Sequence, residues 1–318
     1  MKKKVLALVL AAATIASFSS VISVSAEEQT YTVGICQLVQ HDALDAATQG
    51  FKDALTEALG DAVTFDDQNA QGDSNTCSTI VNSFVSNNVD MILANATPAL
   101  QAAAAATDSI PILGTSVTEY GVALEIDGFD GTVGGNISGT SDLAPLEDQA
   151  AMLQELFPDA KNVGLLYCSA EANSQYQVDA VSALLEAKGI TCTLYPFTDS
   201  NDIQAVCQQA ADNNDVLYVP TDNTAASNAG IIDGICHGKV PVFAGEEGLC
   251  KGCGVATLSI SYYDLGVATG EMAAKILKGE ASVSEMEIGY AATVTPKYNA
   301  ANCEALGLTP PAGYEAIG

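Results

Sequence analysis

The sequence predicts an α/β fold of two similar lobes, each with a parallel sheet, joined by a hinge. The first observation is an internal repeat: Val33–Cys36 and Val163–Leu166 are each followed by a polar loop and an alanine-rich helical pattern. A second matching pair, Val89–Pro98 and Asn214–Asn223, leads in each half to a small-residue helix and a short apolar strand. A cleft between two such units is a natural place for a small ligand.

Strand and helix patterns alternate in the first half of the chain. We expect strands at 31–36, 63–67, 91–94 and 110–113, and helices at 43–59, 75–87 and 98–107. Apolar strands separated by helices of this length form parallel βαβ units. Pro98 suits the first turn of a helix, and Thr97 is a candidate N-cap. The glycine-rich segment 121–139 should be irregular, and the first crossing between the lobes should lie near Gly139–Leu143.

The second half repeats the alternation. We expect strands at 162–167, 191–196, 216–219 and 240–244, and helices at 145–156, 173–188, 201–212 and 223–237. A return strand follows at 255–258, and the amphipathic helix 261–279 should return to the first lobe. The predicted division is 27–140 plus about 258–280 for the first lobe, and 141–257 plus about 281–318 for the second.

The N-terminus has the pattern of a secretory signal peptide, predicted over residues 1–26. Three lysines precede the apolar run Val5–Phe18, and Val24–Ala26 suits cleavage before Glu27. The apolar run is short for a membrane span. We therefore expect an extracytoplasmic mature protein.

The charge of the chain excludes several classes of partner. A formal net charge of −28 argues against nucleic-acid binding, which needs a basic surface. All eleven basic residues are lysine, so no arginine fork can hold a ligand carboxylate. Backbone N–H groups, helix N-termini, hydroxyls or lysine would have to hold it instead. We expect a monomer without a nucleic-acid partner.

Nine cysteines follow the predicted signal peptide, an odd number. Several lie in apolar patterns, where cysteine behaves as a small buried hydrophobe, so we favour free thiols over bridges. With only two histidines and one CxxC motif, at Cys250–Cys253, the sequence argues against a zinc site. We expect no metal and no cofactor.

The expected ligand site lies beyond the carboxyl ends of the parallel strands. This rule selects the loops 37–43, 94–99, 114–119, 168–174, 220–224 and 245–248. Thr97, Asn173 and Asn223 lie at expected helix starts, where N–H groups and the helix dipole favour an anion. Each could equally cap its own helix.

Acidic residues in the same region could pair with a ligand ammonium group or simply form a solvated surface. They are Asp142, Glu171, Asp222, Glu246 and Glu247. Asp222 is the strongest candidate because it directly follows a strand. His41 could contact the ligand or be an exposed loop residue. No GxSxG, Walker A, HExxH or Rossmann glycine motif is present, so we expect no enzyme activity.

Several short motifs occur in a fixed order along the chain. They are GICQLVQHDAL at Gly34–Leu44, DQNAQG at Asp67–Gly72, ANATPA at Ala94–Ala99, GTSDLAP at Gly139–Pro145, EANS at Glu171–Ser174, YVPTDNT at Tyr218–Thr224 and the segment Ala256–Gly279. With these motifs the chain resembles the substrate-binding components of ABC transporters. Among these substrate-binding components, it is similar to the subfamily related to tryptophan- and phenylalanine-binding receptors.

The resemblance implies two Rossmann-like lobes of the type I periplasmic-binding-protein kind, which close on a small solute and present it to a permease. It implies that Thr97 and the N–H groups near Ala99, helped by Ser141, hold an amino-acid carboxylate. The ligand's ammonium and polar groups would meet Asp142, Glu171, Asn173, Ser174, Asp222 and Asn223. The complete set of expected ligand-binding residues is Gln37, His41, Thr97, Pro98, Ala99, Ser116, Ser141, Asp142, Glu171, Asn173, Ser174, Asp222, Asn223 and Glu246.

The chain departs from many Gram-positive relatives because no lipobox cysteine stands at the expected cleavage site. The first hypothesis for the ligand is an aromatic or other apolar L-amino acid. The alternatives are a sugar, nucleoside or other small solute on the same fold, or a ligand sensor. Sugar sites favour stacking aromatics, and this chain has no tryptophan.

Overall fold

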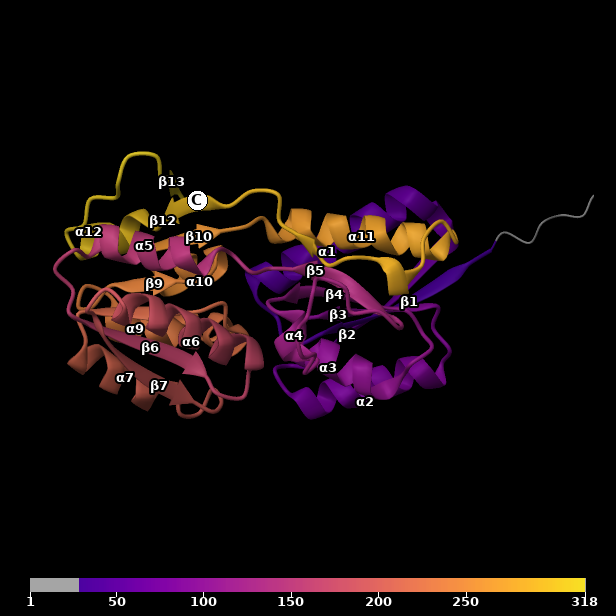
Figure 1. Ribbon diagram of the computed structural model, residues 1–318, viewed down its shortest axis with the longest axis horizontal. Helices are drawn as coiled ribbons and strands as arrows, with labels where there is room; N and C mark the ends of the chain where they lie inside the picture. Colours follow the sequence, from indigo (N-terminus) through magenta and orange to yellow (C-terminus); the bar gives the residue numbers. More distant parts are fainter. Residues whose placement is uncertain (1–28, 318) are drawn as a thin grey trace, which may run out of the picture.

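The computed structural model describes residues 29–317, so the predicted signal peptide lies outside the described residues. Two α/β lobes lie side by side along the long axis of the molecule (Figure 1). Both lobes are built on largely parallel sheets. Among residues 29–317, no helix combines the length and the hydrophobicity needed to cross a membrane.

The first lobe contains a six-stranded parallel sheet in the order β11-β5-β4-β3-β1-β2. Its strands are β1 (Tyr31–Gln37), β2 (Val63–Asn69), β3 (Met91–Asn95), β4 (Ile112–Val117), β5 (Ile137–Ser141) and β11 (Gly289–Tyr290). Its helices are α1 (Asp42–Leu59), α2 (Ser74–Ser86), α3 (Thr97–Ala106), α4 (Tyr120–Ala123) and α11 (Tyr262–Leu277).

The central strands of this sheet are buried on both faces. Met91 and Leu93 of β3 pack with residues of α1 and α11, whereas Ile92 and Ala94 pack with residues of α2 and α3. Continuous burial of this kind explains why these strands read as apolar runs in the sequence. The expected return of the helix near 261–279 to the first lobe is confirmed, because α11 lies beside α1 (Figure 1).

The second lobe contains a seven-stranded sheet in the order β13-β12-β10-β9-β8-β6-β7, with β12 antiparallel to β10. Its strands are β6 (Asn162–Cys168), β7 (Thr191–Phe197), β8 (Val216–Val219), β9 (Val242–Ala244), β10 (Ala256–Ser259), β12 (Thr295–Tyr298) and β13 (Glu315–Ala316). Its helices are α5 (Leu146–Leu156), α6 (Ala172–Glu186), α7 (Ile203–Asn213), α8 (Asn223–Ser227), α9 (Ala229–Cys236), α10 (Glu247–Cys253) and α12 (Ala300–Ala305).

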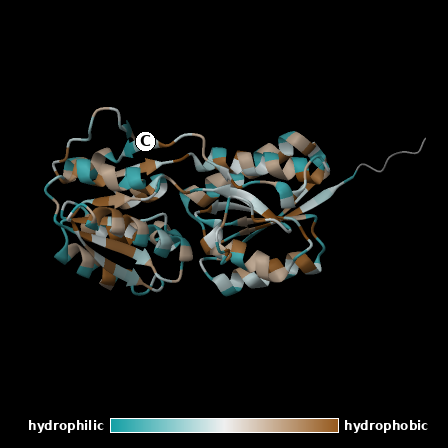
Figure 2. Ribbon diagram, viewed as in Figure 1, coloured by the Kyte–Doolittle hydropathy of each residue, from teal (hydrophilic) through white to brown (hydrophobic). Residues whose placement is uncertain are grey.

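Two apolar clusters cover the two faces of the second sheet. One contains residues of α7, α9 and α10, and the other contains residues of α5 and α6. The helices carry mixed hydrophilic and hydrophobic colouring, while much of the sheet between them is brown (Figure 2). Amphipathic helices therefore cover a largely apolar sheet, which is the packing that the alternating pattern predicts.

The described chain crosses between the lobes in three short segments. Residues 142–145 join β5 to α5, residues 260–261 join β10 to α11, and residues 291–294 join β11 to β12. Short crossings of this kind can serve as a hinge. The observed first crossing agrees with the expectation near Gly139–Leu143.

Two local expectations differ from the structure. The segment 121–139, expected to be irregular, ends in strand β5, where Gly139 adopts φ +146 and lies against the backbone of Gly114. The helix expected over 223–237 is broken at Asn228, whose side chain bonds the Thr224 carbonyl at 2.8 Å. That carbonyl would otherwise accept the backbone N–H of Asn228, so the side chain competes with the helix.

The assignment of residues 281–318 to the second lobe is wrong at its start. Strand β11 pairs with β5 in the first sheet. Ile288 is buried in the first lobe's core, and its N–H donates to the Gly131 carbonyl at 2.8 Å. These contacts hold the chain on the first lobe until the third crossing.

Candidate functional site

The loops that follow the strands of the two sheets face each other across the lobe boundary. His41 Nε2 lies 3.2 Å from Asn223 Oδ1, and Lys251 Nζ lies 3.2 Å from Asp42 Oδ2. Each contact joins a residue of the first lobe to a residue of the second. The lobes are therefore in contact at their strand ends, where the sequence predicts the ligand.

Several predicted site residues carry buried polar atoms that have no protein partner. These atoms are Thr97 Oγ1, Ser116 Oγ, Asp142 Oδ1, Asn173 Oδ1 and His41 Nδ1. A buried polar atom without a hydrogen bond costs about 1–3 kcal/mol. Their concentration at the strand ends of both lobes indicates a site for a ligand that has both donors and acceptors.

The N-terminus of α3 is free of side-chain caps. Its N-cap is Ala96, so Thr97 is the first helical residue rather than the predicted cap, and Pro98 follows in the first turn. Ala96 has φ +92 and Ser116 has φ +54, a region that costs non-glycine residues energy and that is frequent at functional sites. The hydroxyls of Thr97 and Ser116, with the first amides of α3, can hold an anion.

Asp142 offers a free carboxylate oxygen. It follows β5 directly, is almost completely buried, and accepts a hydrogen bond from the Tyr262 hydroxyl at Oδ2, 2.9 Å away. Its other oxygen has no partner. Burial raises the pKa of Asp142, and the hydrogen bond from Tyr262 opposes that rise. A cationic group on a ligand would remove the cost of burying this charge.

Asp222, the strongest sequence candidate for an ammonium partner, has both oxygens bonded to the backbone. Oδ1 accepts the Ala225 N–H at 2.7 Å and caps α8, while Oδ2 accepts the Cys168 N–H at 2.6 Å. Burial, followed by repulsion from Glu171, raises the pKa of Asp222 to about 7. These contacts give Asp222 a positioning role between β6 and α8.

Glu171 is the N-cap residue of α6, but its carboxylate binds the start of α8. It accepts the N–H groups of Asn223 and Thr224 at 3.1 and 2.9 Å. Asn173 donates to the Thr221 carbonyl at 3.0 Å, which leaves its Oδ1 free. Ser174 is completely buried beside it. Helix α8 begins at Asn223 as predicted, but its N-cap is Asp222 and not Asn223.

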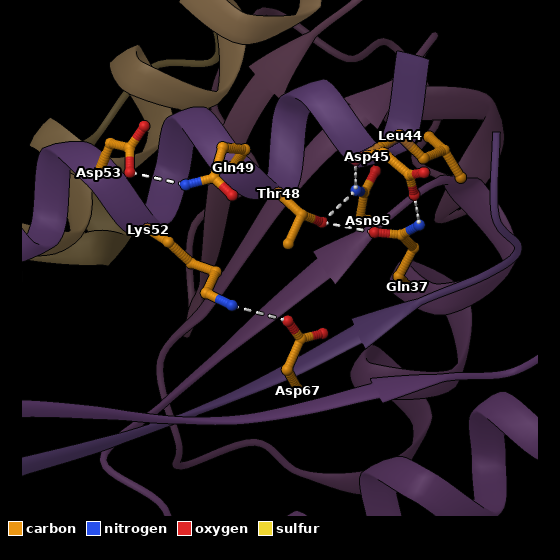
Figure 3. A network of polar contacts seen from close by, with 9 residues as sticks. All are labelled: Gln37, Leu44, Asp45, Thr48, Gln49, Lys52, Asp53, Asp67 and Asn95. Carbon is orange, nitrogen blue, oxygen red and sulfur yellow. Dashed lines mark hydrogen bonds and ion pairs between the residues drawn. The ribbon is translucent and has the colours of Figure 1, made fainter. Parts of the chain in front are cut away.

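Gln37 is buried in a network that satisfies its whole side chain (Figure 3). Its amide donates to the Val39 carbonyl and to Asp45, and its oxygen accepts from Thr48 at 2.6 Å. Asn95 binds the same Thr48 hydroxyl at 2.9 Å. This network holds the β1–α1 loop in place and leaves Gln37 no free polar atom for a ligand.

Ser141 and Glu246 also bind the protein itself. The Ser141 hydroxyl donates to the Thr118 carbonyl at 2.7 Å. Glu246 caps α10 by accepting the N–H groups of Gly248 and Leu249, and burial raises its pKa to about 7. Both residues lie at the predicted strand ends, with contacts that fix the loops.

A cavity of about 170 Å³ opens between the lobes. The first lobe contributes Leu38, Val39 and Pro98 to its lining, and the second contributes Cys168 and Ala170, with Glu171 and Asn223 at the polar side. The sequence singled out the loops that hold Leu38, Val39 and Ala170, but not these residues. Polar side chains such as Gln71, Thr198 and Asn228 complete the lining, so the cavity offers both apolar and polar surface to a small ligand. Ala99 is completely buried at the start of α3.

The buried charges of residues 29–317 are all acidic. They are Asp142, Glu171, Asp222 and Glu246. In the same part of the chain, no group of three or more histidine, cysteine or acidic side chains is arranged to hold a metal ion. A cationic group that enters the site would therefore meet only acidic side chains among these buried residues.

A family model described as ABC transporter substrate binding protein matches residues 32–310. The chain belongs to this family. The fold agrees: two parallel-sheet lobes joined by three crossings are those of a type I periplasmic binding protein, a family of solute receptors rather than of enzymes.

Individual relatives cover most of this binding protein. A tyrosine-binding protein of Clostridioides difficile is 36% identical over 260 residues, which cover 80% of this chain and 75% of the relative. An ABC domain of Streptococcus pneumoniae, solved in complex with L-Trp, is 30% identical with a TM-score of 0.86, covering 91% of this chain and 100% of that one.

The arrangement of the lobes is closer to a ligand complex than to an open form. A substrate-binding protein of Clostridium difficile in its ligand-free, open form is 36% identical and covers 91% of this chain and 99% of its own, with a TM-score of 0.69. The L-Trp complex is less similar in sequence but superposes better. The contacts of His41 and Lys251 with the facing lobe agree with this arrangement.

Proposed function

We propose that this binding protein captures an aromatic L-amino acid, tyrosine or tryptophan, between its lobes and delivers it to an ABC permease outside the cytoplasm. The observation that carries the proposal is the set of unpartnered polar atoms at the strand ends. Two of them are hydroxyls beside the uncapped start of α3, and two are the acceptor oxygens of Asp142 and Asn173. An amino acid presents the complementary carboxylate and ammonium groups.

In this proposal each part of the ligand has its own partners. The carboxylate binds Thr97, Ser116 and the amide of Ala99, as suits a chain without arginine. The ammonium group binds Asp142 and Asn173. The ring occupies the cavity beside Leu38, Val39 and Pro98. The predicted signal peptide would export the protein, and closure of the hinge would follow from contacts that the ligand makes with both lobes.

The relatives support the class of ligand. One is named a tyrosine-binding protein, and another was solved with L-Trp. The surplus of buried carboxylates supports a ligand with an ammonium group over a neutral sugar, which would leave the buried charge uncompensated.

Thermal unfolding of the mature protein against amino acids, sugars and nucleosides tests the proposal. Tyrosine or tryptophan at about 100 times its Kd should add about 2.7 kcal/mol to the free energy of unfolding. N-acetyl-tyrosine, which lacks the ammonium group, is the matched control and should give a much smaller shift. A shift with a sugar or nucleoside and none with any amino acid would contradict the proposal.

A further inference from the structure

The hydrogen bond between Tyr262 and Asp142 connects two of the three hinge crossings. Asp142 is the first residue after β5, in the crossing to the second lobe, and Tyr262 begins α11 directly after the crossing back. The hydroxyl donates to Asp142 Oδ2 at 2.9 Å, and both side chains are buried. This contact joins residues 120 positions apart in the sequence.

Among residues 29–317, the titratable groups that act on Asp142 are two tyrosines and a glutamate rather than a cation. Tyr120 acts on it from α4, Glu246 from the start of α10, and Tyr262 from α11. Burial alone raises the pKa of Asp142, so its ionised form depends on hydrogen-bond donors. The Tyr262 hydroxyl, on α11, is such a donor and lies 2.9 Å from Asp142 Oδ2.

We propose that Tyr262 is a positioning residue for the ligand: its hydroxyl keeps Asp142 ionised and turned so that Oδ1 remains available to an ammonium group. This inference rests on the proposed function, in which Asp142 receives the ammonium. Because the bond joins two crossings, the same contact links an occupied site to the hinge.

The chemistry gives the role a signature that packing alone lacks. Loss of the hydroxyl removes a donor to the charged form of Asp142, so the pKa of Asp142 rises further. A protonated Asp142 presents a neutral carboxyl and binds an ammonium group less well. Ligand binding should then fail at a higher pH than in the wild type.

Tyr262→Phe tests the role, with Tyr263→Phe as the matched control. Tyr263 is the next residue, is 42% exposed, and donates to Asp53 of α1 at 3.0 Å, wholly within the first lobe. Calorimetric titration with tyrosine or tryptophan across the acid and neutral range gives Kd at each pH. We expect Tyr262→Phe to weaken binding about tenfold at neutral pH and to move the acid limb upward. Tyr263→Phe should change neither.

Two outcomes would overturn the inference. In the first, Tyr262→Phe binds as the wild type does; in the second, it binds more weakly with the acid limb unmoved, which marks a packing role only. A readout without ligand separates this inference from the proposed function. In carboxyl NMR of the ligand-free protein, with the Asp142 signal assigned from Asp142→Asn, Tyr262→Phe should raise the titration midpoint of Asp142.

The two proposals can thus fail separately. A wild-type protein that binds neither tyrosine nor tryptophan ends the proposed function. An unchanged Asp142 midpoint in Tyr262→Phe ends the role of Tyr262, whichever solute is bound.

Discussion

At the scale of single residues, the site is defined by which buried polar atoms the protein leaves without partners. Asp142 and Asp222 are both buried carboxyl groups at strand ends, but their bonding differs. Asp222 accepts two backbone N–H groups, whereas Asp142 keeps one oxygen free. Asp222 therefore holds the loops together, and Asp142 is available to a ligand.

This difference predicts opposite effects of two equivalent substitutions. Asp142→Asn should weaken amino-acid binding by tenfold or more, because a charged hydrogen bond contributes about 1.5–3 kcal/mol. It should change the free energy of unfolding little. Asp222→Asn should instead lower that free energy by about 1–3 kcal/mol, because its NH2 group replaces one carboxylate oxygen and cannot accept that N–H.

Urea unfolding and calorimetric titration of the two variants measure both quantities. If Asp222→Asn remains stable but loses its affinity, Asp222 binds the ammonium group, as the sequence first indicated. Loss of affinity in Asp142→Asn without loss of stability would support the bonding described above.

At the scale of elements, helices α1 and α11 approach closely enough to require glycine. A Cβ on Gly266 would lie 2.0 Å from the Ala47 carbonyl oxygen, and one on Gly50 would lie 2.1 Å from that of Tyr263. Both neighbours are backbone atoms, which cannot move aside as a flexible side chain can. This contact places α11 against the helix that follows the β1–α1 loop, so it supports both the hinge and the site.

Gly266→Ala should therefore destabilise the protein, by about 1–3 kcal/mol as overpacked sites do. The matched control is Gly234→Ala in the exposed part of α9, where an added Cβ meets nothing within 4 Å. That change should stabilise the helix by about 0.5–1 kcal/mol. Thermal unfolding of both variants measures these changes in stability. Equal changes in the two variants would contradict the close contact between α1 and α11.

At the scale of the whole molecule, buried carboxyl groups make the stability of the fold depend on pH. Burial raises the pKa values of Asp222 and Glu246 to about 7, from ordinary values of 3.8 and 4.5. The folded state therefore binds these protons more tightly than the unfolded state does. Their contribution to stability is fully present below the unfolded pKa values and is lost as the pH rises through about 7.

The ligand-free protein should accordingly melt at a higher temperature near pH 5 than near pH 8, provided that the same buffer ionic strength is kept. High salt distinguishes the contribution of the buried groups to this pH dependence from that of the surface charge. It does so because salt screens exposed charges far more than buried ones. Glu246→Gln should reduce the pH dependence that persists in high salt. A melting temperature that rises from acid to neutral pH would contradict this account.

The sequence by itself determined the alternation of strands and helices, the two-lobed parallel architecture and the loops that hold the site. These depend on local periodicity and on the rule that parallel strands present ligands at their carboxyl ends, so nearby residues suffice to predict them. The sequence did not predict the two-residue strand β11 or the break at Asn228, because one depends on pairing with the distant strand β5 and the other involves a single side-chain bond.

Only the tertiary structure decided which candidate residues are free. The Cys168 N–H that occupies Asp222 lies 54 positions away, and the Tyr262 hydroxyl that binds Asp142 lies 120 positions away. Whether a buried polar atom is satisfied depends on such distant partners, which no local pattern records. The sequence could therefore identify the carboxylates at the strand ends, and the fold showed that Asp142 is the one with an unpartnered oxygen.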